Sequence, residues 1–177
     1  MNFDIERFRE LLKESISLDQ EGKSLRYSNK AKYDELQDYF ILLQNDTFWQ
    51  SRKDYQQIIN QFVSEKITFD EFEDKHARLR QSNFQTYERR KKNLKEEILT
   101  DSSKINQINL DLNTRSSEFL DILSAIYSDI DLIDHDVTLE MNLKNPELIS
   151  YGMSPEFWRF YLIEKFVPKI NKLCKES

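Results

Sequence analysis

Glycine and proline are scarce in this sequence, which has 2 Gly and 3 Pro among 177 residues. All three prolines (Pro146, Pro155 and Pro168) lie after residue 145. β-Sandwiches, barrels and doubly wound sheets need such residues in their frequent turns. The sequence therefore predicts an all-α fold, an antiparallel bundle of five or six helices.

Apolar residues at helical spacing predict helices over residues 4–18, 29–43, 55–63, 69–99 and 101–126, and a last helix beginning at Ser154. Residues 45–47 (Asn-Asp-Thr) are expected to end the second helix and cap the next one. The helix over 69–99 is expected to bend or fray near residues 81–83. Pro168 is expected to bend the last helix near Glu164, because proline removes a backbone donor. Residues 1–50 are predicted to form an appended helical pair, and residues 51–177 a bundle with a long basic helix inserted.

A helix hairpin is the clearest local pattern. Thr68 and Glu71 have the spacing of a capping box, in which each side chain bonds the other residue's backbone N–H. The helix that follows carries a predicted buried stripe of Phe69, Phe72, His76 and Leu79. A buried histidine is thus favoured at His76 over a di-iron ligand, although Glu73 precedes it by three residues, because a di-iron site needs a second such motif.

Other motifs for chemistry are incomplete. Residues 129–140 resemble a calcium loop, but Ile133 and Asp134 occupy its fifth and sixth positions, and the sixth requires glycine. Cys174 is expected to be a packed thiol, since no base accompanies it in sequence. The sequence therefore predicts no enzyme, no cofactor and no metal site.

No apolar run reaches 18 residues, so a membrane span is not expected. The first ten residues include several charged side chains, so a signal peptide is not expected either. We expect a cytoplasmic protein. The amino acids with AT-rich codons are abundant, which keeps the plastid stroma open as the alternative compartment.

Charge is segregated along the chain, which has a formal net charge of −6. Residues 75–95 contain eight Lys or Arg against one acid, a charge of +7, so the remainder carries −13. The favoured interpretation is a solvated helix face that pairs with neighbouring acidic helices. The alternative is contact with nucleic-acid phosphates through Arg78, Arg80, Arg89, Arg90, Lys91, Lys92 and Lys95.

Residues 55–80 resemble the opening of the colicin D-type immunity family. That family begins with an aromatic-led amphipathic helix, a polar turn ending in Ile-Ser/Thr, and a Glu-Phe-Glu helix; here Tyr55, Ile67-Thr68 and residues 71–73 match. The acidic stretch 129–136 and the Ser-Pro-Glu start at residue 154 follow in the same order, so the resemblance covers about residues 55–173. The first 50 residues have no counterpart, and the +7 segment runs against the acidic character of such inhibitors.

The resemblance implies binding without catalysis. Family members are small helical bundles that block the tRNA-binding cleft of a basic ribonuclease toxin with carboxylates in place of phosphates. The implied partner-binding residues are Glu71, Glu73, Asp74, Asp129, Asp131, Asp134 and Asp136. Each residue also has a structural interpretation. The first three suit the N-terminus of a helix, where negative charge is favourable, and the four aspartates suit a solvated loop.

Two other functions stay open. One is a structural or assembly subunit of a larger complex, perhaps encoded in a plastid, that uses aromatic residues such as Trp49 and Trp158 for assembly. The other is an RNA-binding accessory protein acting through the basic segment.

Overall fold

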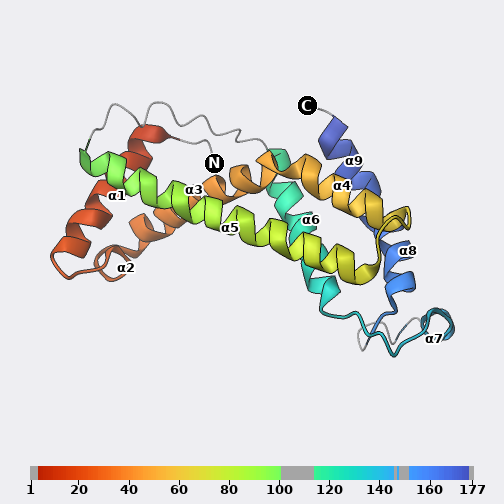
Figure 1. Cartoon of the computed structure of the whole chain (residues 1–177). Coiled ribbons are helices and arrows are strands. Elements are labelled where there is room, and N and C mark those ends of the chain that lie inside the picture. Colours follow the sequence, from red (N-terminus) through yellow and green to blue (C-terminus); the bar gives the residue numbers. More distant parts are fainter. Residues whose placement is uncertain (1–3, 101–113, 146, 148–151, 176–177) are drawn as a thin grey trace. The chain divides into compact units, whose positions relative to one another are not determined.

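The protein is all-α, as predicted. The computed structural model describes residues 4–100, 114–145, 147 and 152–175. Within them there are nine helices and no strand, only an isolated bridge between Ile133 and Met153. The helices are α1 (Ile5–Gln20), α2 (Leu25–Ser28), α3 (Lys30–Gln50), α4 (Arg52–Val63), α5 (Phe69–Thr100), α6 (Thr114–Ile130), α7 (Leu139–Lys144), α8 (Pro155–Lys165) and α9 (Val167–Lys175) (Figure 1).

The prediction that residues 45–47 end a helix is wrong, because α3 continues through them to Gln50. Asp46 and Thr47 are buried, with 1% and 3% of their surface exposed. The Thr47 hydroxyl donates to the Leu43 carbonyl at 2.7 Å, and Arg90 of α5 pairs with Asp46 at 2.8 Å. These polar side chains are therefore satisfied inside the helix, and the backbone does not need to end there.

Two other helix boundaries bear on the predictions. α5 runs unbroken for 32 residues, so the fraying expected near residues 81–83 is not found. Pro168 does interrupt the last helix, which divides at Phe166 into α8 and α9. Ser154 caps α8 as predicted, its hydroxyl accepting from the Phe157 N–H at 3.1 Å. The first part of the helix predicted over residues 101–126, residues 101–113, lies outside the described residues.

The chain divides by its contacts into two compact units. One comprises Met1–Phe48 with Ser82–Ser116, and the other Trp49–Gln81 with Ser117–Ser177. Residues 82–100 thus belong with the N-terminal residues, whereas the sequence-based division grouped them with residues 51–177. Each unit is described by itself below.

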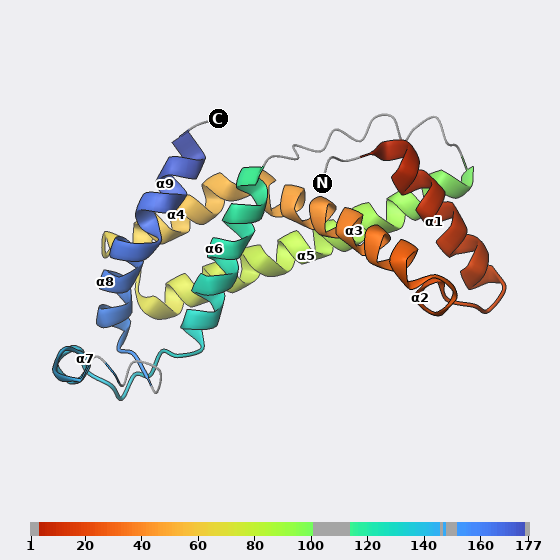
Figure 2. The same cartoon turned by 180° about the vertical axis from the view of Figure 1, so that it is seen from behind.

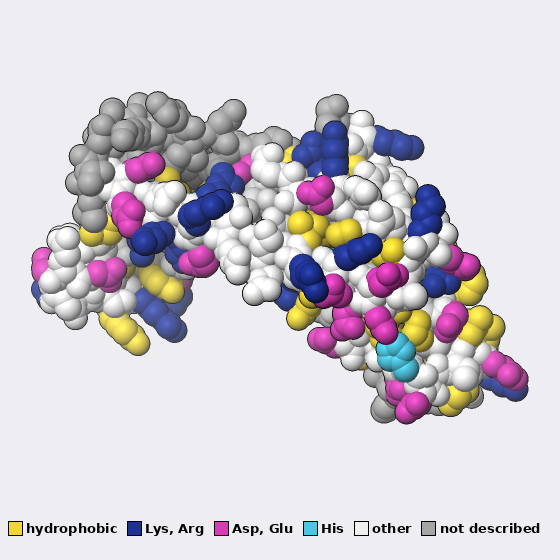
Figure 3. Space-filling view, in the orientation of Figure 1, with side chains coloured by type: hydrophobic (Ala, Val, Ile, Leu, Met, Phe, Trp, Pro, Cys, Tyr) yellow, Lys and Arg dark blue, Asp and Glu magenta, His cyan; other side chains and the backbone are white. Residues whose placement is uncertain are grey.

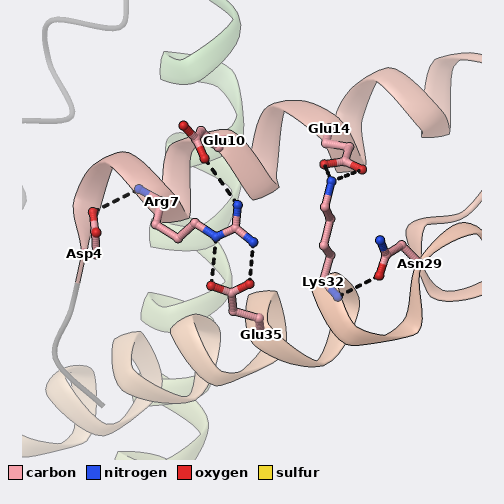
Figure 4. A network of polar contacts seen from close by, with 7 residues as sticks. All are labelled: Asp4, Arg7, Glu10, Glu14, Asn29, Lys32 and Glu35. Atoms are coloured by element: carbon pink, nitrogen blue, oxygen red, sulfur yellow. Dashed lines mark hydrogen bonds and ion pairs between the residues drawn. The ribbon is translucent and has the colours of Figure 1, made fainter.

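In the first unit, α1, α2, α3 and α5 bury one apolar cluster that includes Phe8, Leu12, Phe40 and Leu94. Polar contacts join α1 to α3 at its edge (Figure 4). The Arg7 guanidinium donates to both oxygens of Glu35 at 2.9 and 2.7 Å, which lowers the pKa of that carboxyl. Bidentate geometry of this kind fixes orientation as well as adding attraction.

In the second unit, α4 packs against α8 and α9, as both views of the ribbon show (Figures 1 and 2). Trp158 lies at the centre of an aromatic core, its ring 5.4 Å from Phe62, 5.8 Å from Phe69 and 5.2 Å from Phe72. Trp49 and Trp158 are 2% and 0% exposed. Their expected availability for assembly contacts is therefore wrong: both rings are used in the core.

Candidate functional site

The start of α5 is fixed by the predicted capping box. The Thr68 N–H donates to Glu71 Oε2 at 2.9 Å, and the Glu71 N–H donates to Thr68 Oγ1 at 3.2 Å. Phe69 and Phe72 point into the core. Because residues three and four apart share a helix face, Asp70, Glu73 and Asp74 lie together on an exposed flank.

The acidic loop between α6 and α7 is tied to the start of α8. The Asp134 N–H donates to the Met153 carbonyl and the Met153 N–H to the Leu132 carbonyl, both at 2.8 Å. These two bonds hold the loop backbone in a short parallel pairing around Ile133. The carboxylates of this loop therefore project from a backbone that is held in place by hydrogen bonds.

Asn142 of α7 reinforces this arrangement from a buried position, with 3% of its surface exposed. Its Nδ2 donates to the Gly152 carbonyl at 3.0 Å, and its Oδ1 accepts from the Ser154 N–H at 2.8 Å. Gly152 itself approaches the loop closely: a Cβ there would lie 3.2 Å from Asp134 Cβ and from Val137 Cγ2. A larger residue would push the loop away.

The loop contacts the exposed flank of α5 through His135. The His135 ring lies 5.6 Å from that of Phe69, and its Nε2 is 3.8 Å from Asp70 Oδ1. Acidic side chains gather around the exposed histidine in Figure 3. We call this region the acidic surface; it consists of Asp70, Glu73, Asp131, Asp134, Asp136 and His135.

The acidic surface has few internal counter-charges. Residues 128–143 contain five Asp or Glu and no Lys or Arg. Residues 131–136 line an open hollow of about 430 Å³. Clustered carboxylates repel one another and raise the local concentration of cationic ligands, so this surface suits a positively charged partner.

Four of the implied partner-binding residues also have structural roles. One is Asp134, whose Oδ1 accepts from the Asp136 N–H at 2.9 Å. Glu71 completes the capping box, and Asp74 pairs with Arg78 at 2.8 Å. Asp129 is partly buried; its Oδ2 is inaccessible and has no hydrogen-bond partner among the described residues. Burial raises the pKa of Asp129, although the nearby Lys165 opposes the shift. Glu73, Asp131, Asp134 and Asp136 remain exposed.

The acidic surface also includes two residues that the sequence did not single out as partner-binding, Asp70 and His135. Asp70 lies in the first turn of α5. The signal that could have found it is its spacing, since Glu73 and Asp74 follow three and four residues later. His135 lies inside the acidic run, but its contact with α5 joins residues far apart in sequence.

The basic segment is divided between the two units. In the second unit, Arg78 pairs with Asp74, and the Arg80 guanidinium lies 3.5 Å from the centre of the Tyr127 ring. Arg78 thus pairs with an acid of its own helix rather than of a neighbouring one, and Arg80 contacts an aromatic ring of α6.

In the first unit most of the segment's cations are also engaged. Arg90 pairs with Asp46 at 2.8 Å, and Lys91 Nζ lies 4.6 Å from the centre of the Phe40 ring. Lys92 is 3.7 Å from Glu96. Arg89 is exposed and Lys95 is half-buried.

His76 lies in the core of the second unit, as predicted, with 1% of its surface exposed. Its ring stacks on Phe72 at 5.5 Å and meets the edge of Tyr55 at 5.3 Å. Its Nε2 is buried and has no hydrogen-bond partner among the described residues. Burial, with a smaller contribution from the Arg80 charge, lowers the pKa of His76 from 6.5 to about 4.

His76 is expected to make folding stability depend on pH. Between pH 6.5 and 4, His76 binds a proton in the unfolded chain but not in the folded one. The free energy of unfolding therefore decreases by about 3 kcal/mol as the pH is lowered through this range. A His76→Phe variant is expected to lose this contribution. Urea denaturation at pH 7, 5.5 and 4 would measure it, and parallel pH profiles for the two proteins would contradict it.

Three further observations complete the description. None of the helices in the described part of the chain is long and apolar enough to cross a membrane. The described residues contain no group of three or more His, Cys, Asp or Glu side chains placed to hold a metal ion. Comparisons with protein-family models, curated proteins and solved structures find no match.

Proposed function

We propose that the protein is a non-enzymatic binding module whose acidic surface recognises a basic protein partner. The observation that carries the proposal is the contact of His135 with Phe69 and Asp70, which brings acids from two separate segments onto one surface. Complementary charge of this kind speeds association and favours cationic partners over others.

The finer proposal is that the partner is a basic RNA-cleaving toxin whose active-site cleft this module occupies. It is supported by the resemblance of residues 55–173 to colicin D-type immunity proteins. It is also supported by the exposure of Glu73, Asp131, Asp134 and Asp136, which would take the places of tRNA phosphates.

The ordered backbone of the acidic loop supports the same proposal. Because the bridge at Ile133 and the Asn142 bonds already order the loop, binding would lose little conformational entropy. Preorganisation of this kind raises affinity without new contacts.

A subunit of a larger assembly is the second candidate, and one observation favours it. The outer side of α8 exposes Phe160 and Ile163, at 56% and 41%. These residues replace Trp49 and Trp158 as the apolar contacts to test. If the protein is an assembly subunit, truncating both residues to Ala should release its assembly partners. If it is a binding module with an acidic surface, the same truncation should leave the basic partner bound.

The test is a tagged pull-down from the native source with a triple variant, Glu73→Gln/Asp131→Asn/Asp136→Asn. All three residues are exposed, so the variant is expected to fold. We expect retention of the basic partner to fall by about 30-fold, equivalent to about 2 kcal/mol. Bound proteins and RNA would be quantified after low-salt and high-salt washes.

The matched control is Asp19→Asn/Asp38→Asn/Glu88→Gln, which changes the charge equally at exposed positions of the first unit. It should retain the partner within about twofold of the original chain, since screened charges away from the contact contribute little. Equal losses from both variants would show that binding follows net charge, and the proposal would fail.

A further inference from the structure

The acidic loop and α7 together form a segment that buries no apolar side chain. Residues 131–145 are all described, and Asn142 is the one buried residue among them. Every other helix in the described part of the chain buries at least one apolar side chain. We call residues 131–145 the strap. Its helix, α7, lies at the edge of the second unit in both ribbon views (Figures 1 and 2).

Four hydrogen bonds hold the strap to the residues at the start of α8. The Met153 N–H and carbonyl make two of them with the loop backbone, both at 2.8 Å. The Asn142 amide makes the other two, donating to the Gly152 carbonyl and accepting from the Ser154 N–H. Because all three of these partner residues are buried, the bonds satisfy polar groups that water does not reach.

The contact of the strap with α5 lies at the surface. The His135 and Asp70 side chains are 63% and 81% exposed, and their Nε2 and Oδ1 atoms are 3.8 Å apart. The His135 ring also lies 5.6 Å from that of Phe69. Exposed ion pairs contribute little to stability. The position of the strap therefore depends on its hydrogen bonds more than on this contact.

Asn142 is the most important of these attachments, because two buried backbone groups depend on it. Without the amide, the Gly152 carbonyl and the Ser154 N–H would lose this partner while buried, which costs more than losing an exposed hydrogen bond. Gly152 allows the strap to approach from the other side. A Cβ there would lie only 3.2 Å from Asp134 Cβ and from Val137 Cγ2.

We propose that the strap opens as one segment while the rest of the second unit stays folded, and that Asn142 controls this opening. A segment that buries little apolar surface opens at a low cost in free energy. The strap carries His135 and three carboxylates of the acidic surface, whereas Asp70 and Glu73 stay on α5. The acidic surface is therefore complete only when the strap is closed.

Opening would regulate binding, a step that rests on the proposed function, whereas the opening itself does not. A partner that needs the complete acidic surface binds only the closed form. Its apparent affinity is then reduced in proportion to the fraction of molecules that are closed.

The test of the opening is native-state hydrogen exchange of the full chain, followed by NMR at low urea concentrations. The Asp134 and Met153 N–H groups should exchange at least about 100-fold faster than those of Ile59 and Leu162, which are buried in α4 and α8. Their rates should change little with urea, because the opening exposes little surface. Equal rates and equal urea dependence at all four groups would overturn the inference.

Two variants attack the closed form through different contacts. Asn142→Leu should speed exchange at Asp134 and Met153 by at least about tenfold. Gly152→Ala should do the same, because its added Cβ crowds the loop. The matched control is Asn60→Leu, the same change at an exposed position of α4, which should leave these rates within about twofold. Unchanged exchange in both strap variants would also overturn the inference.

The effect on binding is measured by the same tagged pull-down from the native source, with Asn142→Leu in place of the triple variant. This change leaves every carboxylate and the net charge unaltered. Retention of the basic partner should nevertheless fall by at least about threefold. Full retention despite faster exchange would refute the regulatory role. If the original chain retains no basic partner, the proposed function fails, and the exchange measurements still decide whether the strap opens.

Discussion

Replacing Arg90 with methionine is expected to destabilise the protein by about 3 kcal/mol. Arg90 Nη1 lies 2.8 Å from Asp46 Oδ2, and Asp46 is 1% exposed. The same nitrogen donates to Thr47 Oγ1 at 2.7 Å. Without the guanidinium, the carboxylate would stay buried without its cation, which costs more than the pair itself contributes. Urea denaturation followed by circular dichroism would measure the loss.

A second variant separates the pair from the packing around it. Arg90→Met/Asp46→Leu removes both charges and is expected to recover most of the lost stability. Lys92→Met removes one partner of an exposed pair with Glu96 and should change little. If Arg90→Met proved as mild as Lys92→Met, the account of why α3 continues through residues 45–47 would be wrong.

Truncating Phe72 to alanine is expected to cost about 3–5 kcal/mol, the usual range for a buried phenylalanine. Phe72 is 0% exposed. Its ring lies 4.9 Å from Phe62 and 5.2 Å from Trp158, so its loss would leave a cavity in the aromatic core of the second unit. Tryptophan fluorescence during urea denaturation reports on this core directly, because Trp49 and Trp158 both lie in that unit.

Phe160→Ala is the matched control, since it removes the same side chain from a site that is 56% exposed. It should leave the denaturation midpoint almost unchanged. A large loss of stability from Phe160→Ala together with a small loss from Phe72→Ala would contradict the orientation of the helices described for this unit.

Local signals predicted much of the helical structure. The hairpin of α4 and α5 follows from apolar spacing and from the capping box of Thr68 and Glu71, which needs only residues three apart. Ser154 before Pro155 predicted the start of α8, and Pro168 predicted the break that follows it. Each of these features is decided by contacts within about one helical turn.

Features that depend on distant partners were not predicted. The Asn-Asp-Thr run at residues 45–47 looks like a helix end until Arg90 is placed beside Asp46. Likewise, no local pattern assigns residues 82–100 to the same contact unit as the N-terminal helices. Trp49 and Trp158 were expected to be available at the surface, and the structure places both rings in the core.

The candidate site shows the same division. The acidic runs were recognisable from the sequence, and four of the seven implied residues are exposed on the acidic surface. The other three have structural roles: Asp129 is partly buried beside Lys165. Glu71 completes the capping box and Asp74 pairs with Arg78 four residues later, both through contacts that are local in sequence. The contact of His135 with Asp70 joins segments far apart in sequence, and sequence spacing does not reveal it.

The most direct measurement of the central claim is zero-length carboxyl-to-amine crosslinking of the captured complex, read by mass spectrometry. Because the reaction joins carboxylates to lysines in direct contact, it identifies the surface that meets the partner. We expect crosslinks from Glu73, Asp131 or Asp136 to lysines of a single basic protein that high salt releases. A multi-subunit complex that survives high salt, with no crosslink from these residues, would contradict the account.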